Sequence, residues 1–243
     1  SDVCSSDLFA FDRRDSSRRM SFAKLVQDAY ERRVDLGARG FFATPGVDYN
    51  RDTARGTPYR YYTCGAAVAE VRIDRFTGEM RIERADLLMD LGRLINPAID
   101  RGQVVGGFIQ GAGWVTTEAL IHGPDGTLWT DSATTYKIPH VTDVPAIFKV
   151  DFLGGPLDPE VVCWGNKAVG EPPLLLGLSV WAAVKQALAC AAPGRRPALD
   201  LPATGEEILR RLTEAAAPLG PGVDGHFNGQ HLPATPSNST AVV

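Results

Sequence analysis

The chain has 243 residues, a formal net charge of −4 and an apolar fraction of 44%. That length is enough for one large domain or two modest ones with a substantial core. The small negative charge gives no electrostatic basis for binding nucleic acid or an anionic membrane surface. We therefore expect a globular protein whose partners include neither nucleic acid nor a membrane.

The cysteines give no sign of a metal or disulfide framework. Cys4, Cys64, Cys163 and Cys190 are scattered, without a Cys-x-x-Cys pair or histidines at ligand spacing. This spacing predicts no zinc site, no iron–sulfur site and no metal held by side chains of this chain. No signal-peptide pattern is present, and the longest apolar run, residues 172–184, is shorter than a bilayer-spanning helix. We expect a soluble protein of the reducing cytoplasm.

The two ends of the chain differ from its middle. The opening sequence SDVCSSDL has no hydrophobic periodicity and no initiating methionine, which is typical of a truncation edge or a non-native junction. The last residues are rich in Pro, Gly, Ser and Thr, which predicts a disordered tail. We expect a disordered or non-native edge over residues 1–20, one domain over residues 21–216 and a tail over residues 217–243.

Helix and strand signals alternate along the first half of the chain. Ser21 is the expected cap of a helix that starts at Phe22 and ends at Gly37 or Gly40. Gly78 lies in a turn that requires a positive φ. The other predicted elements are a loop over residues 13–19, a short strand over 41–43, a loop over 46–57, a long strand over 59–73 and its return strand over 80–89.

A glycine-rich helix follows the predicted hairpin. Asn96 is its cap and Pro97 lies in its first turn, and the pattern continues to Val115. Five glycines between residues 102 and 113 each cost roughly 1 kcal/mol relative to alanine, so something must pack on the bare backbone. That partner is either a cofactor or another helix, and the spacing alone leaves both open. No dinucleotide or Walker pattern follows a strand here, which excludes a nucleotide loop.

The second half of the chain predicts two further helices. One opens at Pro173 and ends near Ala192, and another covers residues 206–216 behind a capping box of Thr204 and Glu207. Short strands are expected at residues 127–129, 148–152 and 161–164, and an extended segment at 134–139. The pattern predicts an α+β fold in which antiparallel hairpins pack on buried helices.

One carboxylate is placed unusually. Glu171 follows Gly170 and precedes two prolines that suit the first turn of an almost wholly apolar helix. We expect this helix to be buried, and the carboxylate with it. Burial disfavours the charged form whereas the positive end of a helix favours it, and a carboxylate balanced in this way is a candidate general base. The alternative is a cap that only satisfies backbone amides.

The sequence KAVGEPP at residues 167–173 resembles the start of the active-site helix in the large, molybdopterin-binding subunit of xanthine dehydrogenases, of the xanthine oxidase/aldehyde oxidase family. Further stretches resemble the same family, in order and at similar intervals. These are GAAVAEV at 65–71, INPAIDRGQ at 95–103, GGFIQG at 106–111, WVTTE at 114–118 and TYKIP at 135–139. The resemblance covers about residues 59–209, and it implies the C-terminal part of a molybdenum-hydroxylase large-subunit fold.

The resemblance implies a role for each of two residues. Glu171 would be the catalytic general base, and Gln103 would hydrogen-bond a molybdenum–molybdopterin cofactor whose metal takes no protein side-chain ligand. The alternative for Gln103 is a buried helix amide with internal partners. The implied reaction is oxidative hydroxylation of an sp² carbon beside a ring nitrogen, as in hypoxanthine to xanthine to urate. FAD and 2Fe-2S centres are expected on partner subunits or missing domains, in a hetero-oligomer.

The remaining polar residues carry no implied chemistry. Gln110 and Glu118 are expected to be structural, and His122 and His140 to lie on the surface. Family members are far longer, and their purine-holding residues lie upstream of the matching part, so we expect a fragment that is inactive alone. Two alternatives stay open: an aldehyde oxidase or other molybdenum hydroxylase, and a non-catalytic scaffold or binding domain.

Overall fold

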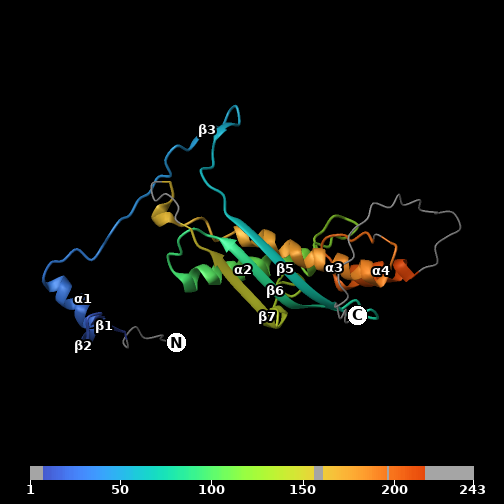
Figure 1. Ribbon diagram of the computed structural model, residues 1–243, viewed down its shortest axis with the longest axis horizontal. Coiled ribbons are helices and arrows are strands. Elements are labelled where there is room, and N and C mark those ends of the chain that lie inside the picture. The colour runs from blue at the N-terminus through green and yellow to red at the C-terminus, as the bar shows by residue number, and fades with distance from the viewer. Residues whose placement is uncertain (1–7, 156–160, 196, 217–243) are drawn as a thin grey trace. The chain divides into compact units, whose positions relative to one another are not determined.

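The computed structural model describes residues 8–155, 161–195 and 197–216 (Figure 1). The predicted tail lies outside these ranges, as do the first seven residues of the predicted N-terminal edge. The chain divides into two compact units, Ser1–Ala43 and Thr44–Val243. The boundaries of the predicted domain stay a prediction.

The first unit is a hairpin followed by a helix. β1 (Phe9–Asp12) and β2 (Asp15–Ser21) pair antiparallel and lead into α1 (Phe22–Glu31). Ser21 caps α1 as predicted, because its Oγ accepts a hydrogen bond from the backbone N–H of Lys24 at 3.3 Å.

Three predictions for this part of the chain are wrong. Residues 13–19 lie mostly in β2, because their backbone pairs across the hairpin while their polar side chains stay exposed. The helix ends well before Gly37, since Arg33 adopts a left-handed conformation, with φ 59°, that a helix cannot continue. Residues 41–43 form no strand, because they pair with none of the described strands.

The second unit is built on a three-stranded sheet with the order β5-β6-β7. β5 (Cys64–Ile73) and β6 (Met80–Asp90) form the predicted antiparallel hairpin, and Gly78 in its turn has φ 75°. β7 (Ile147–Leu153) pairs with β6 in parallel, which the hairpin pattern did not predict. Parallel neighbours need a long crossover, and α2 (Pro97–Thr116) lies within it.

The helices lie on one face of this sheet (Figure 1). α2 was predicted, whereas the predicted helix over residues 173–192 is two elements, the 3-10 helix η4 (Pro172–Gly177) and α3 (Leu178–Ala191). The predicted α+β class is confirmed. The buried core between the layers consists of Ala85, Leu87, Met89, Leu91 and Val150 from the sheet and its end, and of Val104, Phe108, Ala112, Val115 and Val180 from the helices.

α4 (Gly205–Ala216) closes a second, smaller core with the end of α3. Thr204 caps it as predicted, accepting from the N–H of Glu207 at 3.2 Å. The second hydrogen bond of the predicted capping box, from the N–H of Thr204 to Glu207, is wrong. The Glu207 carboxylate instead accepts from the N–H of Asp200 at 3.0 Å and from Arg211 at 2.7 Å. Burial alone would raise the pKa of Glu207, but these hydrogen bonds outweigh it and hold that pKa below its ordinary value.

Several local predictions in the second unit are wrong because turns and short bridges replace the expected ladders. The long strand starts at Cys64 rather than at residue 59. Residues 134–139 begin in a turn, closed by the N–H of Tyr136 on the carbonyl of Ser132 at 2.8 Å. In place of a strand at 127–129 there is an isolated bridge between His122 and Leu128. In place of a strand at 161–164 there is the 3-10 helix η3 (Cys163–Gly165). The predicted loop at 46–57 contains a small hairpin of β3 (Asp48–Asn50) and β4 (Arg55–Thr57).

Two glycines of α2 let η4 approach its backbone. A Cβ built on Gly111 would lie 2.1 Å from the carbonyl oxygen of Leu174, and one on Gly107 would lie 3.0 Å from the Cβ of Pro173. Gly106, on the same helix, has nothing within 4 Å of such a Cβ. Close packing of helices therefore explains Gly107 and Gly111 but leaves Gly106 open.

Gly111→Ala should lower the free energy of unfolding by about 2–4 kcal/mol, because its methyl group must push the η4 backbone away. Gly106→Ala is the matched control: it should leave stability unchanged or raise it by up to about 1 kcal/mol, through helix propensity alone. Urea unfolding of both variants measures the difference. Equal destabilisation would contradict the role given to the α2–η4 contact.

Candidate active site

The N-terminal half of α2 presents Gln103. Asn96 caps the helix as predicted, with its Oδ1 accepting from the N–H groups of Ala98 at 3.2 Å and Ile99 at 3.3 Å. Gln103 lies about two turns further on and is exposed, and its amide has no hydrogen-bond partner among the residues described. The alternative of a buried amide with internal partners is therefore wrong. A Cβ on neighbouring Gly102 would, like one on Gly106, meet nothing within 4 Å.

Glu171 directly precedes η4, whose first turn holds Pro172 and Pro173 as predicted. The expected burial of Glu171 is wrong: its side chain is exposed. The apolar helix buries only one side on the sheet and α2, and Leu175 on another side remains 64% exposed. The cap alternative is also wrong, because the Glu171 carboxylate accepts no backbone hydrogen bond at this helix start.

The contact between α2 and η4 brings Gln103 close to Gly170, the residue before Glu171. The Oε1 of Gln103 lies 3.9 Å from the position of a Cβ on Gly170, the residue before Glu171. A Cβ on Gly107 would lie 3.5 Å from the carbonyl oxygen of Gly170. The amide of Gln103 therefore lies beside the backbone that leads into Glu171, although the two residues are distant in sequence. We call Gln103, Gly106 and Glu171 with their surroundings the α2–η4 face.

The α2–η4 face is open and is not part of a described cavity. A cavity of about 610 Å³ runs along β5 and α3, and neither Gln103 nor Glu171 lines it. A second cavity of about 30 Å³ lies beside the C-terminal half of α2. Gln103 and Glu171 therefore line neither of these two cavities.

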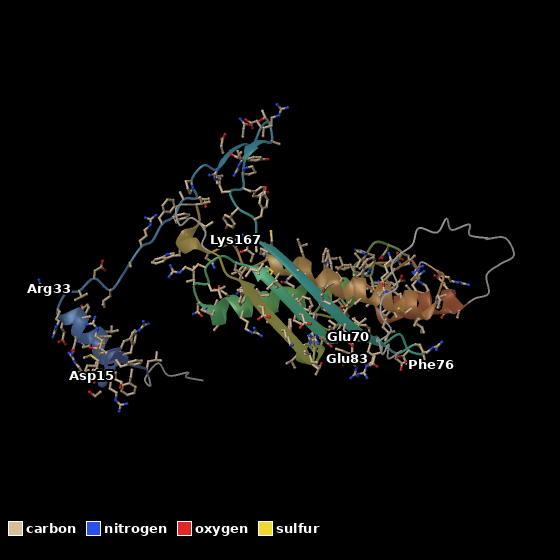
Figure 2. All side chains as sticks on the ribbon, viewed as in Figure 1. Asp15, Arg33, Glu70, Phe76, Glu83 and Lys167 are labelled. Atoms are coloured by element: carbon tan, nitrogen blue, oxygen red, sulfur yellow. The ribbon has the colours of Figure 1, made fainter. Side chains whose placement is uncertain are left out.

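The segment leading into Glu171 is anchored by a buried cation. The side chain of Lys167 is only 10% exposed, and its Nζ lies 2.5 Å from the Oδ2 of Asp90 at the end of β6. Figure 2 shows Lys167 at the end of the β5–β6 hairpin away from Phe76. The hydrogen bond from Lys167 holds the pKa of Asp90 below its ordinary value. Thr63 holds the same segment by a second hydrogen bond, in which its Oγ1 donates to the carbonyl of Ala168 at 2.8 Å.

Sequence reasoning missed this ion pair. Asp90 is 77 positions from Lys167, so no local pattern joins them. The signal that could have found it is a single lysine directly before a long apolar segment, where a charge is costly unless it is paired.

The other polar residues of the sequence prediction have structural or surface places. Glu118 accepts a hydrogen bond from the hydroxyl of Tyr136 at 2.7 Å, which raises the pKa of Tyr136 and confirms a structural contact for Glu118. His122 and His140 are exposed, as predicted. Gln110 is exposed as well, and its role stays a prediction. No group of three or more His, Cys, Asp or Glu side chains suited to a metal ion occurs in the described part of the chain.

η4 and α3 together form an apolar helical stretch, Pro172–Ala191, that is long enough to cross a membrane by length and composition. The prediction that the apolar run at residues 172–184 is shorter than a membrane-spanning helix is therefore wrong, because the apolar helical stretch continues to Ala191. Val180, Val184 and Leu188 of this stretch are buried on the sheet and on α4. A core helix passes the same test of length and composition, so this one stretch is weak support for a membrane location.

Comparisons with known proteins give the family of the chain. Residues 4–145 match the family model of the molybdopterin cofactor-binding domain, and the chain belongs to this family. That match includes Gln103 and ends before Glu171. The family resemblance read from the sequence motifs is confirmed.

Curated relatives are more specific. The chain is 47% identical over 199 residues to xanthine dehydrogenase of Oryza sativa subsp. japonica, covering 77% of this chain and 14% of that protein. It is 38% identical over 218 residues to xanthine dehydrogenase/oxidase of Gallus gallus, covering 87% and 16%. The chain thus spans only about a seventh of the length of these relatives.

Solved structures show the same fold. Quinoline 2-oxidoreductase from Pseudomonas putida 86 is 33% identical with a TM-score of 0.52, over 59% of this chain and 18% of that one. Aldehyde oxidoreductase from Desulfovibrio gigas is 30% identical with a TM-score of 0.51, over 66% and 16%.

Asp90→Asn should lower the free energy of unfolding by about 1–2 kcal/mol at neutral pH, because Lys167 loses its partner. The pKa of Asp90 is lower in the folded protein, so its stabilisation is complete above its unfolded pKa of about 3.9 and is lost as the pH falls through the folded pKa. The difference between wild type and variant should therefore close in strong acid. Urea unfolding from neutral pH down to about pH 2 measures it, and a constant difference would contradict the ion pair.

Proposed function

We propose that this chain supplies part of the active site of a molybdenum hydroxylase, with Gln103 holding the molybdopterin cofactor and Glu171 acting as general base. One observation carries the proposal: the exposed amide of Gln103 lies beside Gly170, directly before the exposed Glu171, and neither side chain has a described internal partner. A free amide can donate to and accept from a ligand. A free carboxylate beside it can take a proton from a reacting group.

The described residues fit a large, polar cofactor at this face. Gly102 and Gly106 flank Gln103 and leave bare backbone where a Cβ would occupy the space above the helix. Packing on η4 does not account for these two glycines, whereas it accounts for Gly107 and Gly111. The cofactor, when bound, supplies the electron acceptor of the oxidation. The residues of this chain position it and accept a proton.

Xanthine dehydrogenase relatives at 38–47% identity favour a purine substrate, with hypoxanthine oxidised to xanthine and urate. Solved structures of a quinoline and an aldehyde oxidoreductase favour, as a second candidate, another N-heterocycle or an aldehyde. The activity belongs to a longer protein or complex, and we expect the chain alone to be inactive. FAD and 2Fe-2S centres would lie on other domains or subunits of a cytoplasmic hetero-oligomer.

Glu171→Gln, made in the complete enzyme, should lower turnover at least about 100-fold, because loss of a general base typically costs a factor of 10²–10⁴. The molybdenum content should stay normal, since the amide keeps the shape of the side chain. Glu206→Gln, at an exposed carboxylate in the first turn of α4, is the control. Near-normal turnover of Glu171→Gln with xanthine and with aldehydes would remove the general-base assignment.

Gln103→Ala should reduce the molybdopterin content of the purified enzyme, because the cofactor loses a hydrogen-bond partner that no neighbouring side chain replaces. Gln110→Ala is the matched control, an exposed glutamine on the same helix. Molybdenum and pterin analysis of both variants decides the matter. Equal cofactor content in the two would contradict the role of Gln103.

A further inference from the structure

We propose that Lys167 and Asp90 are a positioning pair for Glu171. Their ion pair fixes residues 166–170, here called the strap, and the strap sets where the Glu171 carboxylate stands on the α2–η4 face. This inference rests on the proposed role of Glu171.

The strap is joined to the end of β6 by main-chain and side-chain bonds. The N–H of Lys167 donates to the carbonyl of Leu91 at 2.9 Å. The Nδ2 of Asn166 donates to the carbonyl of Arg93 at 2.9 Å, and Asn166 also forms an isolated antiparallel bridge with Gly92. These bonds set the direction in which the strap leaves the sheet.

The ion pair makes this attachment specific. Lys167 is the only cation among the buried residues of the described chain. The carboxylate of Asp90 accepts hydrogen bonds from the Nζ of Lys167 at 2.5 Å and from the N–H of Gly92 at 3.1 Å. A buried ammonium without its partner is strongly unfavourable, so losing either charge forces the strap to move or to hydrate.

Only three residues separate Lys167 from Glu171, and each of them contacts another part of the chain. The carbonyl of Ala168 accepts from Thr63 at 2.8 Å, and Val169 packs against the main core. Gly170 has its carbonyl against Gly107 of α2. We therefore expect a displacement of the strap at Lys167 to displace Glu171 as well.

Lys167→Met tests the pair in the complete, cofactor-loaded enzyme, because methionine fills a similar volume without a buried charge. We expect kcat to fall about 10–100-fold, since a displacement of about 1 Å in a catalytic group costs up to 10². KM should change less than about threefold, and Lys167→Arg should recover much of the loss. The control is Arg72→Met, which breaks the Arg72–Glu83 ion pair toward the other end of β5, where Figure 2 shows Glu83.

A double-variant comparison separates positioning from general damage. In a Glu171→Gln background, Lys167→Met should lower kcat no further, because it acts through the missing base. A merely structural role would lower the active fraction by the same factor in both backgrounds, which would overturn the proposal. A second readout is independent of activity: amide hydrogen exchange at residues 168–171 should accelerate at least about tenfold in Lys167→Met and remain unchanged in Arg72→Met.

The two proposals fail in different ways. Normal turnover of Glu171→Gln would overturn the general-base assignment and this inference with it. An inactive Glu171→Gln combined with unchanged kcat and unchanged exchange in Lys167→Met would overturn the positioning pair alone. If Lys167→Met does not fold, Asp90→Asn is judged by the same readouts, because it replaces a side chain that is 32% exposed by its isostere.

Discussion

The close approach of α2 to η4 is the contact on which the rest of the site depends. A Cβ on Gly177 would lie 2.4 Å from the backbone of Gly111, and one on Gly111 would overlap Leu174. Only bare backbone on both elements permits this distance. Because the two elements meet here, Gln103 of α2 comes within reach of Gly170 and the start of η4. With larger residues at these positions, the amide and the carboxylate would stand further apart.

In the second unit, the apolar core and the polar hydrogen bonds determine different features of the structure. The core between the sheet and its helices fixes the layers but not the position of a single carboxylate. That position depends on a few polar bonds at the end of β6, chief among them the ion pair of Lys167 and Asp90. At the second core, the carboxylate of Glu207 in α4 likewise holds a neighbouring segment, because it accepts a hydrogen bond from the N–H of Asp200.

The exposure of Glu171 and Gln103 bears on how the proposed chemistry would work. Electrostatic interactions with a reacting group are weaker in contact with water than in a dry site, because water screens charge. The proposed activity therefore requires that the α2–η4 face be covered when it acts. The matched part of this chain covers only 14–16% of the length of the relatives, so those relatives have ample further polypeptide to do so.

The sequence alone determined the elements whose signals lie within a few residues. The caps Ser21, Asn96 and Thr204, the turn at Gly78 and the prolines after Glu171 were all read from local patterns, as was the resemblance that singled out Gln103. Only the tertiary structure decided the parallel pairing of β7, the exposure of Glu171, the sorting of the glycines into packed and open ones, and the partnership of Lys167 with Asp90. Each of these depends on which distant segments meet, and local backbone preference carries no information about that.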